Sequence, residues 1–151
     1  MTLKLDCPGS IVPHKGKMLL LSRIISYDLK EQTLCAEYDI TENCIFYNPV
    51  IKVVPAWVGF EFIAQAISAL SGLRGLMSEE EPKIGYILSV SSMQIISPFF
   101  QAGNTVQINV KESGLLDQVY NFEGTIFLEG KEVLNGKLTV IETSEKQSIS
   151  N

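Results

Sequence analysis

Glu61 is the residue best suited to chemistry, because it is the single ionisable side chain in the apolar stretch 53–73. At about 100° per residue of a helix, Gln65, Ser68 and Gly72 share one narrow stripe with it. A stripe facing solvent normally carries several charges, and a carboxylate removed from water must be partnered or neutralised. The pattern therefore predicts the polar wall of a cleft, with Gln65 at i+4 hydrogen-bonding Glu61 and contributing to the substrate site. A purely structural carboxylate is the alternative.

A carboxylate in such a cleft suits general acid or base catalysis. Trp57 extends the stripe by one turn and is a candidate substrate contact, with an ordinary core position as the alternative. The start of the helix offers free N–H groups at about residues 56–58, including that of Ala56. Such groups can stabilise an oxyanion, for example the oxygen of an enolised thioester carbonyl. The predicted chemistry is thus acid–base catalysis beside an oxyanion site.

The rest of the chain is typical of strands that surround this helix. Pro55 suits the first turn of a helix ending at about residue 77, and EGK at 129–131 predicts a tight hairpin. The expected strands are 18–28, 33–40, 82–96, 104–113, 117–130 and 131–142. This order predicts an α+β fold, one domain over residues 1–142 with a curled antiparallel sheet around the helix, and a disordered tail over 143–151.

One sheet covers one side of a helix that has no broad polar face. Burying the other side and pairing an edge strand are natural tasks for a second copy of the chain. The pattern therefore predicts a homodimer or a higher oligomer.

Composition excludes several classes of protein. The 151 residues are 46% hydrophobic and 19% charged, with a net charge of −5 and a pI near 4.9, which argues against a nucleic-acid surface. No Cys/His metal spacing occurs, and we expect no metal and no cofactor. Three cysteines without a motif indicate reduced thiols in a cytoplasmic protein. The polar residues within 53–73 argue against a membrane span, and Asp6 and Pro8 argue against a signal peptide.

Three segments resemble the β-hydroxyacyl-acyl-carrier-protein dehydratases. VPHKGKMLLLSRIISYD (12–28) resembles their opening, PAWVGFEFIAQA (55–66) their central-helix signature, and IGYILSVSSMQIISPFFQAGNTVQINV (84–110) their third and fourth strands. The similarity covers about residues 11–142, and the branch associated with aryl-polyene-type lipid pathways shares the PH-x-G-x-M-x-LL opening. The resemblance implies a hotdog fold, a dimer with sites between subunits, and acyl-carrier-protein or coenzyme A thioesters as substrates.

The chain departs from that family just before the helix. The family's His-Phe-Pro-Gly segment is matched here by residues 47–50, so Tyr47 replaces the catalytic His and Val50 replaces the Gly whose N–H serves the thioester carbonyl. Val50 retains its N–H, and Tyr47 is a candidate hydrogen-bond donor. His14 is the single histidine; it is either a catalytic residue or a structural one.

Three functions remain open at this point. The first is dehydration of 3-hydroxyacyl thioesters with Glu61 as acid and base. The second is a thioesterase in which the helix carboxylate activates water. The third is a non-catalytic protomer that binds an acyl chain or supports an active relative in a heteromer.

Overall fold

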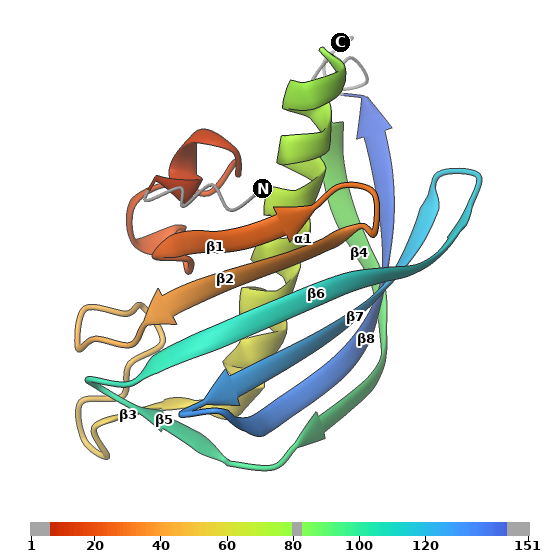
Figure 1. Cartoon of the computed structure of the whole chain (residues 1–151). Helices are drawn as coiled ribbons and strands as arrows, with labels where there is room; N and C mark the ends of the chain where they lie inside the picture. The colour runs from red at the N-terminus through yellow and green to blue at the C-terminus, as the bar shows by residue number, and fades with distance from the viewer. Residues whose placement is uncertain (1–6, 80–82, 145–151) are drawn as a thin grey trace, which may run out of the picture.

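The computed structural model describes residues 7–79 and 83–144 of the chain (Figure 1). Three short 3-10 helices cover Pro8–Ser10, Gly16–Met18 and Ala56–Val58. The long helix is α1 (Gly59–Ser78), and the strands are β1 (Arg23–Asp28), β2 (Thr33–Asp39), β3 (Val53–Pro55), β4 (Lys83–Ile95), β5 (Phe99–Gln101), β6 (Thr105–Leu116), β7 (Val119–Leu128) and β8 (Lys131–Ser144).

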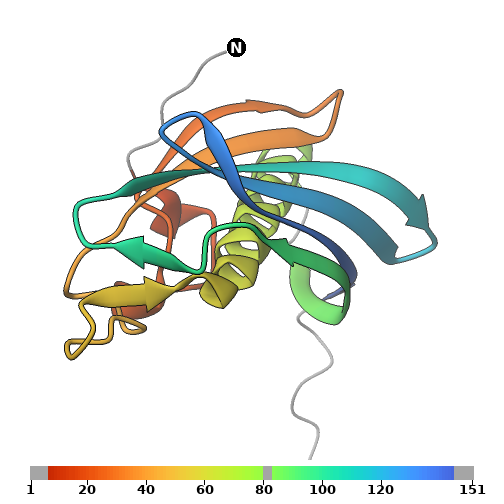
Figure 2. The same ribbon diagram turned by 90° about the horizontal axis from the view of Figure 1, so that it is seen from below.

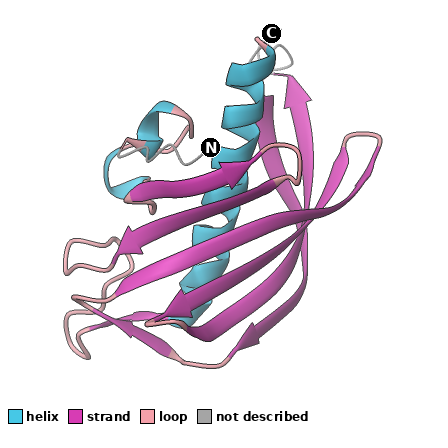
Figure 3. Cartoon of the chain, in the orientation of Figure 1, coloured by secondary structure: helices cyan, strands magenta, loops and turns pink. Residues whose placement is uncertain are grey.

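Six of the strands form one antiparallel sheet in the order β1-β2-β6-β7-β8-β4. This sheet curls around α1, which lies along its concave side (Figures 1 and 2). A small second sheet pairs β3 with β5 beside the N-terminal end of α1. Figure 3 shows the long helix α1 against the wrapping layer of strands, which confirms the predicted α+β architecture.

Local sequence explains the strands that were expected. Buried and part-exposed residues alternate along β2 and the first half of β6, as they should in strands with one face on a core. The expected hairpin at 129–131 joins β7 to β8, with Leu128 opposite Lys131. Glu129 and Gly130 have φ angles of 51° and 77°, the left-handed conformations that a two-residue turn of type I′ requires.

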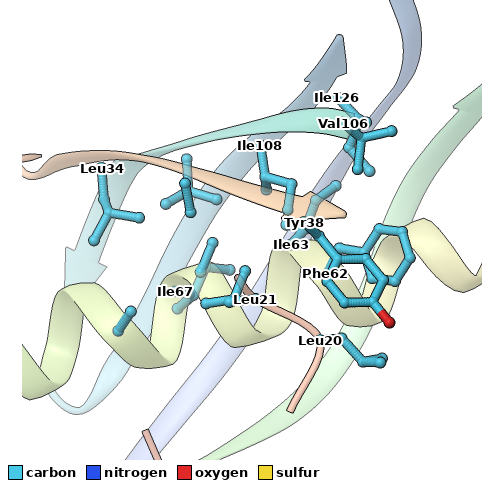
Figure 4. Close-up of a cluster of buried hydrophobic side chains, with 14 of the residues drawn as sticks. Leu20, Leu21, Leu34, Tyr38, Phe62, Ile63, Ile67, Val106, Ile108 and Ile126 are labelled. Atoms are coloured by element: carbon cyan, nitrogen blue, oxygen red, sulfur yellow. The ribbon is translucent and has the colours of Figure 1, made fainter. Parts of the chain in front are cut away.

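The core lies between α1 and the concave face of the sheet (Figure 4). Ile63 of α1 packs against Gly124 of β7, where an added Cβ would lie 2.4 Å from the Ile63 side chain. The absence of a side chain at residue 124 therefore lets the helix approach the sheet closely. The other apolar side chains labelled in Figure 4 belong to the same buried core: Leu20, Leu21, Leu34, Tyr38, Phe62, Ile67, Val106, Ile108 and Ile126.

Several element boundaries differ from the sequence prediction. The first strand starts at Arg23 rather than at residue 18, because Leu20 and Leu21 are buried in an irregular segment. The helix starts at Gly59, and Pro55 pairs with Phe99 in the small sheet that the sequence did not indicate. β8 runs to Ser144, past the predicted domain end, and the remainder of the predicted tail lies outside the described residues.

The edge strand β4 is unusually apolar for a surface strand. Among the described residues it pairs with β8 along one side only, and its exposed side chains include Tyr86 and Leu88, which are 54% and 56% exposed. An exposed edge with such side chains is a template for pairing with another strand.

The helical stretch 56–78 is long and apolar enough to cross a membrane by length and composition. Within the protein, however, 61% of its most apolar part is buried. This degree of burial is that of the core helix of a folded domain.

Candidate active site

A cleft of about 1020 Å³ follows α1 from Glu61 to Ser78. One wall is formed by residues 10–14 of the lead-in segment, residues 8–22, which crosses the helix before β1 begins. The opposite wall comes from β4 and β8, with Ile87 and Val140 among its apolar residues. The cleft is therefore a long channel with α1 as its floor, where the predicted stripe residues Ser68 and Gly72 lie together with apolar residues such as Ile67.

His14 and Glu61 meet at one end of the cleft. The Nε2 atom of His14 lies 3.6 Å from Oε1 of Glu61, and the two side chains are 28% and 27% exposed. Nδ1 of His14 is buried and has no hydrogen-bond partner among the described residues. An unpaired buried N–H costs more than a buried bare ring nitrogen, so this favours the tautomer with its proton on Nε2, pointing to the carboxylate and the cleft.

Gln65 lies one turn beyond Glu61 and is 1% exposed. Its Nε2 donates to Oε1 of Glu61 at 3.1 Å, the i+4 contact that the helical spacing predicted. The same amide also bonds the lead-in segment: Oε1 accepts the N–H of Leu20 at 2.7 Å, and Nε2 donates to the carbonyl of Met18 at 2.9 Å. The sequence pattern placed Gln65 on the cleft stripe, whereas the structure buries it beneath the lead-in segment.

The far end of the cleft is polar. Arg74 bonds Glu112 at 3.1 Å and Glu142 at 3.2 Å, and its guanidinium lies 5.1 Å from the ring centre of Tyr120. Ser71 donates to the same Glu142 oxygen at 2.7 Å. Two carboxylates face one guanidinium here, so the cleft has polar groups at both of its ends.

This second polar group is not among the site residues predicted from the sequence. A signal was present on β8, where Leu138, Val140 and Glu142 alternate and all three are buried. Continuing that alternation to residue 142 would have placed a carboxylate on the inner face of the sheet.

Tyr47 and Val50 lie in the loop before β3 and are not among the residues that line the cleft around Glu61 in this chain. Val50 is 86% exposed, and its N–H donates to Oδ1 of Asn48 at 2.9 Å. Tyr47 packs against the edge of the core. Desolvation raises the pKa of the Tyr47 phenol above its ordinary value, and the charge of Glu42 acts in the same direction.

Ala56 and Trp57 lie in the 3-10 helix before α1. Ala56 is fully buried, and its N–H donates to the carbonyl of Pro98 at 2.9 Å, so this N–H is already engaged within the chain. Trp57 is 53% exposed and packs edge-on against Phe46, with ring centres 6.2 Å apart. The structure thus brings together His14, Glu61 and Gln65, while the other four candidates lie elsewhere on the chain.

A family model described as ApeP-like, ApeP dehydratase, matches residues 7–151. This chain belongs to the ApeP-like dehydratase family. The dehydratase resemblance seen in the sequence is therefore confirmed at the level of family. The 3-hydroxyacyl-[acyl-carrier-protein] dehydratase FabZ of Chlamydia trachomatis serovar L2 is 24% identical over 143 residues, which is 93% of this chain and 92% of that protein. The FabZ of Chlamydia caviae is 31% identical over a shorter 67 residues, 42% of this chain and 44% of that protein.

Solved structures share the same hotdog fold. A chain of the dehydratase heterocomplex ApeI:P from Xenorhabdus doucetiae matches with a TM-score of 0.84 and 22% identity, covering 93% of both chains. A putative thioesterase, a phenylacetic acid degradation-related protein from Ralstonia eutropha JMP134, matches with a TM-score of 0.60 and 21% identity, covering 78% of this chain and 82% of that one. At these identities the likeness concerns the fold alone, and dehydratases and thioesterases both use it.

Proposed function

We propose that this protein dehydrates 3-hydroxyacyl thioesters, and that Glu61 and His14 of one chain carry the reaction. The observation that carries this proposal is the 3.6 Å approach of His14 Nε2 to Glu61 Oε1 at one end of a largely apolar cleft. The family membership and the FabZ relatives, whose name specifies 3-hydroxyacyl-[acyl-carrier-protein] dehydration, support the same reaction class.

In the proposed reaction, Glu61 removes a proton from Cα of the acyl group. The Cα–Cβ double bond then forms as the C–O bond at Cβ breaks, and the proton held by Glu61 passes to the departing hydroxyl, which leaves as water. His14 donates a hydrogen bond from Nε2 to that hydroxyl and stabilises its departure. The carboxylate and the imidazole are both unchanged at the end, so no further reactant is needed.

His14 would thus fill the place left by the family's usual histidine. Tyr47 occupies that position in the sequence, but an unperturbed phenol titrates near pH 10 and the Tyr47 pKa is higher still. Tyr47 is therefore unsuited to removing a proton at neutral pH. Its proposed role is limited to donating a hydrogen bond if its loop faces the cleft of a second subunit, and the Val50 N–H is already engaged with Asn48.

We further propose that the substrates are acyl-carrier-protein thioesters and that the protein is cytoplasmic. We also propose that a second hotdog protomer pairs along β4, which the exposed apolar side chains of that edge support. The ApeI:P complex, a heterocomplex by its name, makes a related protein as reasonable a partner as a second copy.

Mass spectrometry of a 3-hydroxyacyl-carrier-protein incubated with the purified protein tests the proposal. Loss of one water from the acyl group is expected, and Glu61→Gln should reduce its rate by about 100-fold or more. Release of free acid would instead establish the thioesterase. An unchanged thioester, both alone and with a co-purifying hotdog partner, would leave the non-catalytic protomer as the function.

A further inference from the structure

We propose that Gln65 is a positioning residue of this site rather than a substrate contact. It decides which oxygen of Glu61 faces the substrate, and it holds the lead-in segment that carries His14. This inference rests on the proposed function, and it concerns a residue that the helical pattern alone had placed against the substrate.

The burial and bonding of Gln65 exclude direct contact with a ligand. The residue is 1% exposed, and a side-chain amide has two N–H donors and one oxygen. One donor serves Met18 and the other serves Glu61, at 2.9 and 3.1 Å. The oxygen accepts the Leu20 N–H at 2.7 Å.

The orientation of this amide is determined by main-chain groups. The Leu20 N–H can only donate, so the atom facing it must be the amide oxygen, and the Met18 carbonyl can only accept, so the atom facing it must be the nitrogen. A flipped amide would lose both bonds. Toward Glu61, Gln65 is therefore always a donor.

A fixed donor at Oε1 assigns different tasks to the two oxygens of Glu61. Oε1 receives the bond from Gln65 and is also the oxygen nearest His14. This oxygen is therefore already engaged within the chain. Oε2 has no hydrogen bond among the described residues, and Glu61 lines the cleft, so Oε2 is the oxygen left to take the substrate proton.

The same amide also locates His14. Met18 and Leu20 follow His14 in the lead-in segment, and on its other side Ile11 rests against Gly72 of the same helix. His14 is thus held between two contacts to α1, and Gln65 supplies the one nearer Glu61. Loss of its amide would free the segment and the carboxylate together.

Two substitutions separate this role from a structural one. Gln65→Met has a similar volume but makes none of the three bonds. We expect kcat to fall about 10- to 100-fold with KM within about threefold, since a bond to a charged group is lost. Gln65→Glu keeps an acceptor for Leu20 but places a second carboxylate against Glu61. Because neighbouring carboxylates raise each other's affinity for protons, the acidic limb of the pH–rate profile should move up by about one pH unit or more.

Gln107→Met on the exposed outer side of the sheet is the matched control and should change none of these quantities. A raised KM with unchanged kcat in Gln65→Met would make Gln65 a substrate contact. A lowered melting temperature with the pH profile of Gln65→Glu unmoved would reduce its role to fold stability. Either result overturns the proposal.

Hydrogen exchange provides a readout that does not depend on activity. The backbone amides of the lead-in segment, Leu20 above all, should exchange at least about tenfold faster in Gln65→Met than in the wild type, because the Leu20 N–H loses its acceptor. If the wild type shows no turnover, the proposed function fails, but this measurement still tests the inference. Unchanged exchange at Leu20 would overturn it.

Discussion

The carbonyl oxygen of Ile11 lies directly against the backbone of Gly72: a Cβ atom added at residue 72 would be 2.1 Å from that oxygen and 3.1 Å from its carbon. The lead-in segment can cross α1 at this depth because residue 72 has no side chain. Three residues after Ile11, the chain brings His14 to Glu61. The spacing between the two proposed catalytic side chains therefore depends on a glycine about three helical turns beyond Glu61.

Gly72→Ala should displace the lead-in segment and destabilise the fold by about 1–3 kcal/mol, since the contact is with main-chain atoms that cannot rotate away. In a helix interior with open space, Gly→Ala is instead stabilising by about 1 kcal/mol. Gly75→Ala is the matched control, because nothing lies within 4 Å of a Cβ built there. Urea unfolding of both variants measures the two effects. Equal, stabilising shifts would contradict the observed crossing.

Tyr47→Phe tests whether the residue at the position of the family's usual histidine takes part in the chemistry. Since His14 is the proposed donor to the departing hydroxyl, we expect kcat within about threefold of the wild type. His14→Asn should in contrast lower kcat by about 10- to 100-fold. Single-turnover rates on the same thioester decide between them. If Tyr47→Phe were slower than His14→Asn, the donor role would belong to Tyr47, acting on the cleft of a second subunit.

Arg74→Met tests the polar far end of the cleft. Glu112 and Glu142 would lose their shared cation while remaining 15% and 8% exposed. We expect a loss of about 3 kcal/mol at pH 7, because an unpaired buried carboxylate is costly. Urea unfolding at pH 7 is the measurement.

Arg23→Met is the control for that experiment. Arg23 bonds Glu37 and Asp39 on a more open surface, where a pair contributes about 1 kcal/mol or less. The bond from Arg23 is the largest cause that holds the pKa of the Asp39 carboxyl below its ordinary value. The stability from this pair is therefore present at neutral pH and lost as the pH falls through the lowered pKa. A larger loss at pH 7 for Arg23→Met than for Arg74→Met would contradict the assignment of Arg74 to a protected site.

Leu88→Lys tests pairing along β4. Leu88 is 56% exposed on the free edge, and a lysine there should disfavour a second strand. We expect the protein to shift toward the monomer in sedimentation or light scattering, with the dimer dissociation constant raised about tenfold or more. Leu116→Lys is the control, because Leu116 is 76% exposed and lies beside the turn between β6 and β7, away from β4. This variant should leave the molecular mass of the assembly in solution unchanged. Equal behaviour of the two variants would place the interface elsewhere.

The sequence by itself determined the features that depend on neighbours a few residues apart. Alternation predicted the long strands, the residues at 129–131 predicted the hairpin, and helical spacing predicted the contact of Glu61 with Gln65. The apolar stretch around Glu61 also indicated one buried helix and a cleft beside it. Each of these follows from the fixed rise and turn of an element, so the sequence pattern is sufficient.

Tertiary structure alone decided how the site is assembled. His14 is 47 residues from Glu61, and Leu20 is 45 from Gln65, so no local periodicity relates them. Their meeting depends on an irregular segment crossing α1 at Gly72, and the path of such a segment is set by close packing and main-chain bonds rather than by a repeat. The Arg74 cluster joins α1, β6 and β8 in the same way. Gln65 appeared in sequence as part of the cleft wall, and only the fold showed that its amide is buried and bonds Glu61, Met18 and Leu20.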